Sequence, residues 1–179
     1  MTSKSRLVGL YHRPGFLLKR CHQVSMAIFL EESREFNVTQ SQYGCLRALH
    51  EYPDVDQIAL GRLVGLDRST AAMVIRTLSD RGLIQRLADH RDKRRMRLQM
   101  TAQGERLLDD IAPAAARAQE RVLKGLPPAS RAAFLGTLEN FLAGHAALID
   151  VDRVLAALPM PDDPHGRQRS VPSARASAR

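Results

Sequence analysis

Between residues 14 and 53, apolar side chains recur every three or four positions, which is the spacing of amphipathic helices. Pro14 suits the first turn of a helix, because proline lacks the N–H that would stay unbonded there. The apolar face that follows predicts a helix to about Phe36. Thr39 and Gln42 then form a Thr-x-x-Gln capping box, which predicts the start of a second helix that Pro53 ends.

The same spacing continues in two shorter segments on either side of a glycine. Residues 58–64 form the first segment, which closes at Gly65. Asp67 is a typical N-cap for the next helix, and Gly82 is the left-handed stop expected at its end. The apolar positions i, i+3 and i+7 predict the buried face of this helix: Ala71, Val74 and Leu78. Helix, tight turn and helix in this order indicate a helix-turn-helix.

The residues after Gly82 have strand character in two stretches, 83–88 and 96–100. Thr101 predicts the cap of a long helix, and two consecutive prolines precede a last helix that runs to Ile149. From about Pro159 the chain loses all periodicity, which predicts a disordered tail.

These elements predict a mainly α fold with a small β-hairpin wing, which is a winged helix-turn-helix. The first and last helices are too apolar for a small monomer whose winged helix closes its own core. We therefore expect them to pack against a second copy in a two-fold homodimer. The predicted parts are an N-terminal arm (residues 1–13), a dimerisation helix (14–38), a DNA-binding lobe (39–102), C-terminal dimerisation helices (103–150) and a largely disordered basic tail (151–179).

The net charge is +8 and the pI is near 10.3, which favours a polyanionic partner such as nucleic acid. The charge is concentrated, because seven cations and two anions lie between Arg81 and Arg97. The two cysteines cannot form a disulfide framework and show no metal-ligand spacing. No apolar run reaches the roughly 18 residues that span a bilayer, and no secretory segment is recognisable. We expect a cytoplasmic protein without a membrane partner.

The helix after Asp67 is the predicted DNA reader, and its outward positions are Arg68, Ser69, Thr70, Ala72, Met73, Arg76 and Thr77. Arginine can bond guanine O6 and N7 bidentately, whereas serine and threonine can bond several base edges or phosphates. Asp92 is interpreted as the partner that orients a neighbouring arginine. The hairpin would reach the minor groove or flanking phosphates with Arg91, Lys93, Arg94 and Arg95. A dimer sets two reader helices ~34–36 Å apart, so the predicted partner is double-stranded DNA with an inverted repeat.

Residues 89–104, DHRDKRRMRLQMTAQG, resemble the wing signature of the MarR family of bacterial transcriptional regulators, with Asp92, Arg94 and Thr101 at the key places. LDRSTAAMVIRTLSDRGLI resembles the recognition helix and strand entry of that family, and the resemblance covers about residues 14–150. It implies a triangular homodimer that binds a palindromic operator and that a small ligand, often an anionic aromatic, releases. Met73 departs from the basic or polar base reader of many relatives, which leaves the operator sequence open.

YHRPGFLLKRCHQ, positions 11–23, resembles a branch of the family that regulates breakdown of aromatic acids such as hydroxycinnamates, some members of which sense the acyl-CoA thioester. Arg13 and Arg20 lie seven residues apart, hence on one helix face and ~10.5 Å from each other. With Phe16 between them, and His12 and Tyr43 nearby, they could bind an aromatic carboxylate or its CoA thioester. The alternative is that these arginines lie on the surface or pair across the dimer.

Further features of the sequence bear on other functions. Cys21 on the first helix suggests a thiol-based peroxide sensor, and the basic charge and tail fit a non-specific nucleoid-type DNA binder. The six histidines show no zinc-site spacing, so neither metal nor cofactor is expected. Adjacent carboxylates such as Glu31 and Glu32 point to different helix faces, and no phosphate loop or nucleophile elbow is present, so we predict no enzyme activity.

Overall fold

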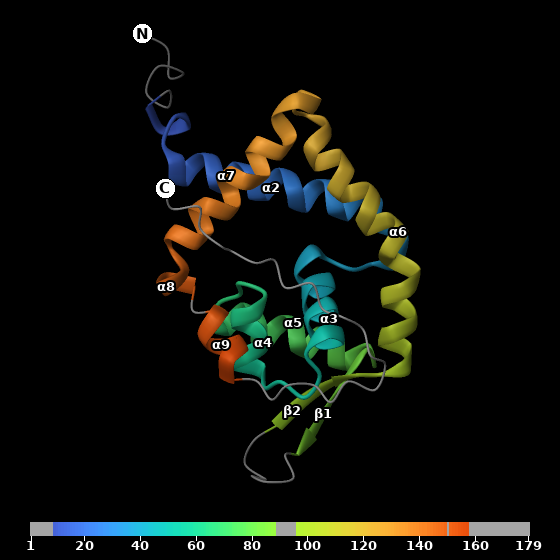
Figure 1. The fold of residues 1–179 in the computed structure, drawn as a ribbon. Coiled ribbons are helices and arrows are strands. Elements are labelled where there is room, and N and C mark those ends of the chain that lie inside the picture. Colours follow the sequence, from blue (N-terminus) through green and yellow to red (C-terminus); the bar gives the residue numbers. More distant parts are fainter. Residues whose placement is uncertain (1–8, 89–95, 150, 158–179) are drawn as a thin grey trace.

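The computed structural model describes residues 9–88, 96–149 and 151–157. Its elements, in chain order, are α2 (Pro14–Glu32), η1 (Arg34–Phe36), α3 (Gln40–Glu51), α4 (Gln57–Leu63), α5 (Arg68–Asp80), β1 (Ile84–Ala88), β2 (Met96–Met100), α6 (Ala102–Lys124), α7 (Pro128–Gly144), α8 (Ala146–Ile149) and α9 (Val151–Ala157). The predicted mainly helical fold with a two-stranded wing is confirmed (Figure 1). None of the described helices is long and apolar enough to cross a membrane.

The helix starts follow from local capping chemistry. At α3 both bonds of the capping box form, from Gln42 N to Thr39 Oγ1 and from Thr39 N to Gln42 Oε1. Asp67 caps α5 and Thr101 caps α6, as the sequence predicted. At the other ends, Gly65 and Gly82 have φ angles of 70° and 69°, the left-handed region that glycine adopts without strain.

Helices α3, α4 and α5, the wing and the start of α6 enclose one apolar core in the lower half of the molecule (Figure 1). The predicted inner face of α5 is confirmed, because Ala71, Val74 and Leu78 are all buried there together with Ile75. We call these elements the reading lobe. Its core closes within one chain.

The wing is a hairpin in which Ile84 pairs with Met100 and Ala88 with Met96. A third segment joins it, because Val55 forms an antiparallel bridge with Leu98. The sequence pattern does not predict this pairing. The added pairing fixes the base of the wing to the connection between α3 and α4.

A second apolar cluster lies where α2 meets α6, with Phe29 and Ile111 at its centre. Exposed ion pairs border it: Glu32 accepts from Arg117 Nε at 2.9 Å and from Arg121 at 2.6 Å. Helix α2 therefore runs across the end of the molecule opposite the wing and is attached to α6 at its C-terminal half (Figure 1).

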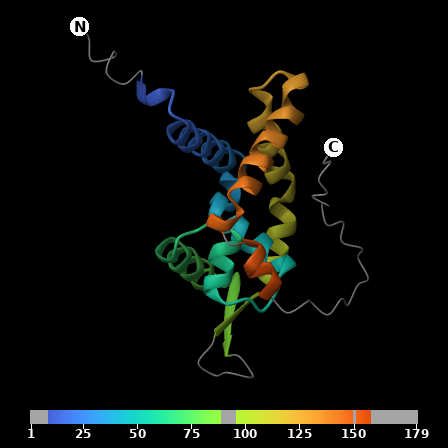
Figure 2. The ribbon, with the colours of Figure 1, turned by 60° about the vertical axis from the view of Figure 1, so that its left-hand side comes forward.

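The C-terminal segment differs from the prediction in two ways. The last helix does not run unbroken to Ile149, because α7 ends at Gly144 and α8 is a separate turn. Residues 151–157, which we assigned to the tail, form helix α9 beside α4 (Figure 2). Val154 is buried there, so contact with α4 supplies the burial that makes this short helix form. Residues 158–179 lie outside the described part of the chain.

Candidate nucleic-acid interface

Helix α5 presents a polar and cationic face to solvent, opposite its buried face. Arg68, Ser69 and Arg76 are exposed there, and Met73 is 62% exposed. Thr70, Ala72 and Thr77 are half-buried at the edge of this face. A helix held by its apolar side, with such a face free, has the form that enters a DNA major groove.

The first turn of α5 is organised by a single carboxylate, that of Asp67. Its Oδ1 accepts from the backbone N–H groups of Ser69 and Thr70, both at 2.9 Å, and from Ser69 Oγ at 2.6 Å. Its Oδ2 accepts from Thr70 Oγ1 at 2.6 Å. These bonds, those from the two hydroxyls foremost, hold the pKa of Asp67 far below its usual range, so the side chain is an anion. The sequence had predicted the cap but not the two hydroxyl bonds.

Two further polar side chains of this face, those of Arg76 and Thr77, have partners on their own helix. Thr77 Oγ1 donates to the Met73 carbonyl at 3.0 Å, and Arg76 lies 3.7 Å from Asp80 across an exposed ion pair. Such an exposed ion pair contributes little to stability, so Arg76 can readily exchange Asp80 for a DNA phosphate or base. Arg76 is therefore available to bind DNA.

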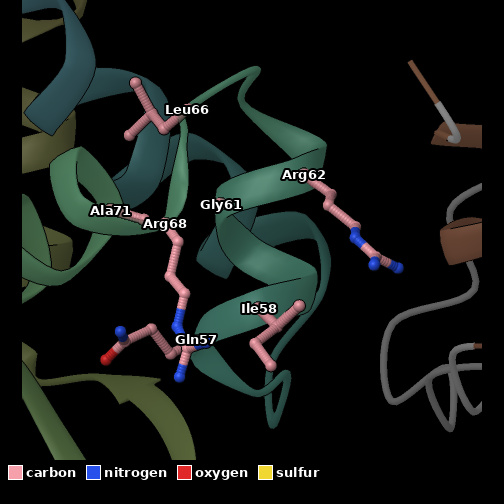
Figure 3. A pocket seen from close by; sticks show the side chains of 7 residues that line it. All are labelled: Gln57, Ile58, Gly61, Arg62, Leu66, Arg68 and Ala71. Carbon is pink, nitrogen blue, oxygen red and sulfur yellow. The ribbon is translucent and has the colours of Figure 1, made fainter. Parts of the chain in front are cut away.

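A pocket of about 350 Å³ is lined by residues of α4, of α5 and of the turn between them. Arg68 and Gln57 lie near its lower end, whereas Arg62 points away along the other side of α4 (Figure 3). None of the predicted effector residues lines this pocket. Arg68 thus extends along the seam between the two helices of the helix-turn-helix.

Two of the seven cations counted between Arg81 and Arg97 serve the fold. Arg81 donates to the carbonyls of Asn37 and Phe36, at 2.6 and 3.2 Å, and so ties the end of α5 to the segment after α2. Arg97 lies 3.7 Å from Asp54, which also accepts from Gln99 at 2.8 Å. Charge counting cannot separate such internal pairs from DNA contacts.

Asp54 is a positioning residue that the sequence analysis missed. Its φ of 66° is left-handed, a conformation that aspartate tolerates better than most residues, and it follows Pro53. It orients Arg97 and Gln99 on β2. The residues expected at the wing tip, Arg91, Asp92, Lys93, Arg94 and Arg95, lie outside the described residues.

The residues predicted to bind an effector are not all brought together within one chain. His12, Arg13 and Arg20 are exposed on the N-terminal part of the chain, where Arg20 bonds Gln23. Phe16 packs edge-on against Tyr11 at a ring distance of 5.1 Å.

Tyr43 lies elsewhere, against Phe29 at 5.3 Å. Phe29 follows Phe16 by thirteen residues, or ~20 Å of helix. Tyr43 therefore does not close a slot with Arg13 and Arg20 of the same chain.

Comparison with known proteins identifies the family. The sequence profile of the MarR family matches residues 38–96, the stretch from the start of α3 to the start of β2. The putative transcriptional regulatory protein for the hcr operon of Thauera aromatica is 33% identical over 70% of this chain and 76% of its own length. The chain belongs to the MarR family.

Solved structures of MarR-like regulators share the fold. One of them is BpsR of Bordetella bronchiseptica, a protein whose DNA binding is regulated by 6-hydroxynicotinic acid. It has a TM-score of 0.67 and is 27% identical over 73% of this chain and 94% of its own. The transcriptional repressor CouR, solved on a 23-mer DNA duplex, has a TM-score of 0.67 and 25% identity over 75% of this chain and 96% of its own. This MarR protein is thus a DNA-binding transcriptional regulator and not an enzyme.

Two residues of the wing signature have structural roles in this MarR protein. Thr101 Oγ1 donates to the carbonyl of Gly82 at 2.7 Å and accepts from Gly104 N at 3.1 Å. Gly104 is buried, and a Cβ there would overlap the carbonyl oxygen of Leu83. The Thr-x-x-Gly pattern therefore lets α6 start directly against the strand entry.

The two cysteines of this MarR protein differ in their surroundings. Cys45 is buried in the reading lobe, and burial raises the pKa of its thiol to about 12, which makes it unreactive. Cys21 is exposed on α2. Within the described ranges, no group of three histidine, cysteine or carboxylate side chains could hold a metal ion.

Proposed function

We propose that this MarR-family regulator is a repressor that binds an inverted-repeat operator as a homodimer, and that an aromatic carboxylate or its CoA thioester releases it. The outward face of α5 supports this function most directly, because its reader side chains stand on a helix whose inner face is buried in the core of the reading lobe. CouR, a repressor solved on a DNA duplex, shares the fold.

In this proposal, α5 enters the major groove. Arg68 and Arg76 bond guanine edges or phosphates, and Met73 contacts thymine methyl groups. Ser69, Thr70 and Thr77 contact bases or phosphates from the same face. The wing follows the flanking minor groove with Arg91, Lys93, Arg94 and Arg95, which Asp92 orients.

The dimer would form through α2 and α7. These helices expose large apolar side chains that the described residues cover only in part: Leu17, Leu18, Val24, Met26, Leu30, Leu135, Phe141 and Leu142. Apolar surface of this extent on two neighbouring helices is typical of a subunit interface. Two-fold symmetry then presents two α5 helices to successive major grooves.

The effector would bind near the N-terminal half of α2. Arg13 and Arg20 supply cations for a carboxylate or a CoA phosphate, and Phe16 and His12 line the slot. Tyr43, on α3, packs against Phe29 in the C-terminal half of the chain's own α2, so in this proposal a second protomer supplies the tyrosine of the slot. Arg81 links the segment after the C-terminal end of α2 to the end of α5, so a movement of the whole of α2 on effector binding would reach the reader through these bonds.

Fluorescence anisotropy tests this proposal. The full chain is titrated onto DNA from the region upstream of its gene and onto a scrambled duplex. Specific binding that weakens by orders of magnitude between ~50 and ~200 mM salt supports the operator reader. Equal affinity for both duplexes would instead identify a non-specific nucleoid-type binder.

The effector is tested in the same assay with p-coumarate, p-coumaroyl-CoA and 6-hydroxynicotinate. Release by one of them, lost in Arg13→Ala and Arg20→Ala but kept in Arg34→Ala, supports the slot on α2, since Arg34 is exposed beyond the C-terminal end of that helix. Operator affinity that none of the compounds changes would contradict the effector class. If peroxide released the DNA and Cys21→Ser abolished that release, a thiol sensor would replace the proposed aromatic effector.

A further inference from the structure

The hydroxyl groups at the start of α5 have a fixed hydrogen-bond polarity. Ser69 Oγ and Thr70 Oγ1 each donate their hydrogen to the Asp67 carboxylate, at 2.6 Å. A hydroxyl has one hydrogen and two lone pairs, so a hydroxyl that donates to Asp67 can only accept from anything else. Bonds to a carboxylate are also roughly twice as strong as those between neutral groups, which disfavours rotation away from it.

Ser69 is exposed and Thr70 half-buried, at the N-terminal end of the helix that is proposed to enter the major groove. This end of a recognition helix is the part that contacts base edges. Serine and threonine can ordinarily bond either donors or acceptors there. The Asp67 carboxylate removes that freedom and leaves a cluster of acceptors.

We propose that Asp67 is a positioning residue that makes Ser69 and Thr70 acceptor-only readers, so that each half-site presents the exocyclic amino group of an adenine or a cytosine to them. This inference rests on the proposed operator binding. Each base pair carries one amino donor in the major groove, on A in an A·T pair and on C in a G·C pair. The readers therefore distinguish which strand carries the amino group. With T or G at the same place, an acceptor oxygen of the base would face the acceptor oxygens of Ser69 and Thr70, and no hydrogen bond could form.

The substitution Asp67→Asn should release Thr70 from its acceptor-only state. Asparagine caps helices as well as aspartate does, and its Oδ1 would keep the bonds from the two backbone N–H groups and from Ser69 Oγ. Its Nδ2 would then face Thr70 Oγ1 and donate to it, in place of the carboxylate oxygen that now accepts. The Thr70 hydrogen becomes free to donate to DNA.

Asp56→Asn is the matched control. Asp56 caps α4 by accepting from Ala59 N at 2.8 Å, and this substitution removes the same charge from the same helix-turn-helix. No hydroxyl bond to Asp56 is among its described contacts. The control thus keeps the cap and the charge change but leaves the readers of α5 as they are.

The experiment selects the preferred duplex from a random pool with the wild-type full chain, and then with each variant. The wild type and Asp56→Asn should prefer A or C at one position of each half-site. Asp67→Asn should bind T or G there as well as A or C, so that the roughly tenfold wild-type preference is lost. Asp67→Asn/Thr70→Val should bind every base at that position more weakly than Asp67→Asn does, because the hydroxyl that bonds the base is gone.

A second measurement uses only the wild type, so it does not depend on how any variant folds. Replacing that adenine by purine, or that cytosine by 2-pyrimidinone, deletes the amino group and should weaken binding about tenfold. Unchanged affinity for the analogue, or an unchanged preference in Asp67→Asn, overturns the inference while leaving operator binding intact. A pool from which the wild type enriches no sequence refutes the proposed operator reader itself.

Discussion

Helices α6 and α7 are consecutive and both rich in apolar residues, but they relate to the core in opposite ways. Helix α6 has 23 residues and buries six of them within the chain: Gly104, Leu108, Ile111, Ala114, Ala115 and Ala118. Helix α7 has 17 residues and buries none, although it carries Leu135, Phe141 and Leu142. Apolar content alone therefore does not decide burial. Burial also requires a second apolar surface to pack against, and the described residues of the chain cover α7 only in part.

The largest expected effect removes a side chain from the α6 side of this comparison. Ile111→Ala should lower the free energy of unfolding by about 2–5 kcal/mol. Ile111 lies on α6 and is fully buried in the cluster where α6 meets α2, so the truncation leaves a cavity. Urea denaturation measures this. The control is Leu142→Ala on α7, where the side chain is 52% exposed. Measured at high dilution, where the chain is a monomer, it should lower the free energy of unfolding far less. Equal losses would mean that α7 is as deeply packed as α6.

The second prediction takes α7 as a dimer surface. Phe141→Ser/Leu142→Ser should weaken self-association by about 2–4 kcal/mol, or on the order of 100-fold, since both side chains are about half exposed in the single chain. Analytical ultracentrifugation over a concentration series measures it. An unchanged mass distribution would place the interface elsewhere.

Two glycines sharpen the comparison at the level of single atoms. Gly104→Ala should destabilise the chain by about 1–3 kcal/mol, because the added methyl group would overlap the Leu83 carbonyl and approach Met100 Cγ to 2.6 Å. Gly136→Ala in α7 meets no atom within 4 Å and should stabilise by about 0.5–1 kcal/mol through helix propensity. Thermal unfolding distinguishes the two signs. A destabilising Gly136→Ala would show that another chain packs closely there.

The sequence predicted best what is decided within a few residues. The caps at Thr39, Asp67 and Thr101 depend on bonds to N–H groups two or three positions away, so a short pattern contains all the information. The left-handed φ angles at Gly65 and Gly82 are local in the same sense.

Non-local pairing was outside the reach of such patterns. The bridge of Val55 to Leu98 joins residues 43 positions apart, and α9 is a seven-residue helix that packs against α4, almost a hundred residues earlier in the chain. Helical periodicity placed Arg13 and Arg20 on one face but could not say that Tyr43 meets Phe29 instead. The hydroxyl bonds to Asp67 also depend on rotamers, which a cap motif leaves open.

The smallest expected effect concerns the exposed ion pairs that hold α2 against α6. Bonds from Arg121 and then Arg117 lower the pKa of Glu32 below its ordinary value of 4.5. The carboxylate therefore stabilises the folded chain above about pH 4.5, and this contribution is lost as the pH falls through the lowered value. Glu32→Gln should lower the melting temperature slightly near neutral pH, and the difference from the wild type should shrink in acid. Added salt should reduce it too, because exposed ion pairs are screened.

Glu139→Gln on α7 is the matched control, since no described residue forms an ion pair with Glu139 and the substitution should leave the melting temperature unchanged across the same pH range. If Glu32→Gln and Glu139→Gln behaved alike at every pH, the pairs with Arg117 and Arg121 would contribute nothing measurable. Helix α2 would then be held on α6 by the contacts around Phe29 and Ile111 alone. A difference that grows in acid would contradict the lowered pKa, because protonation at Glu32 should make the wild type resemble the glutamine variant.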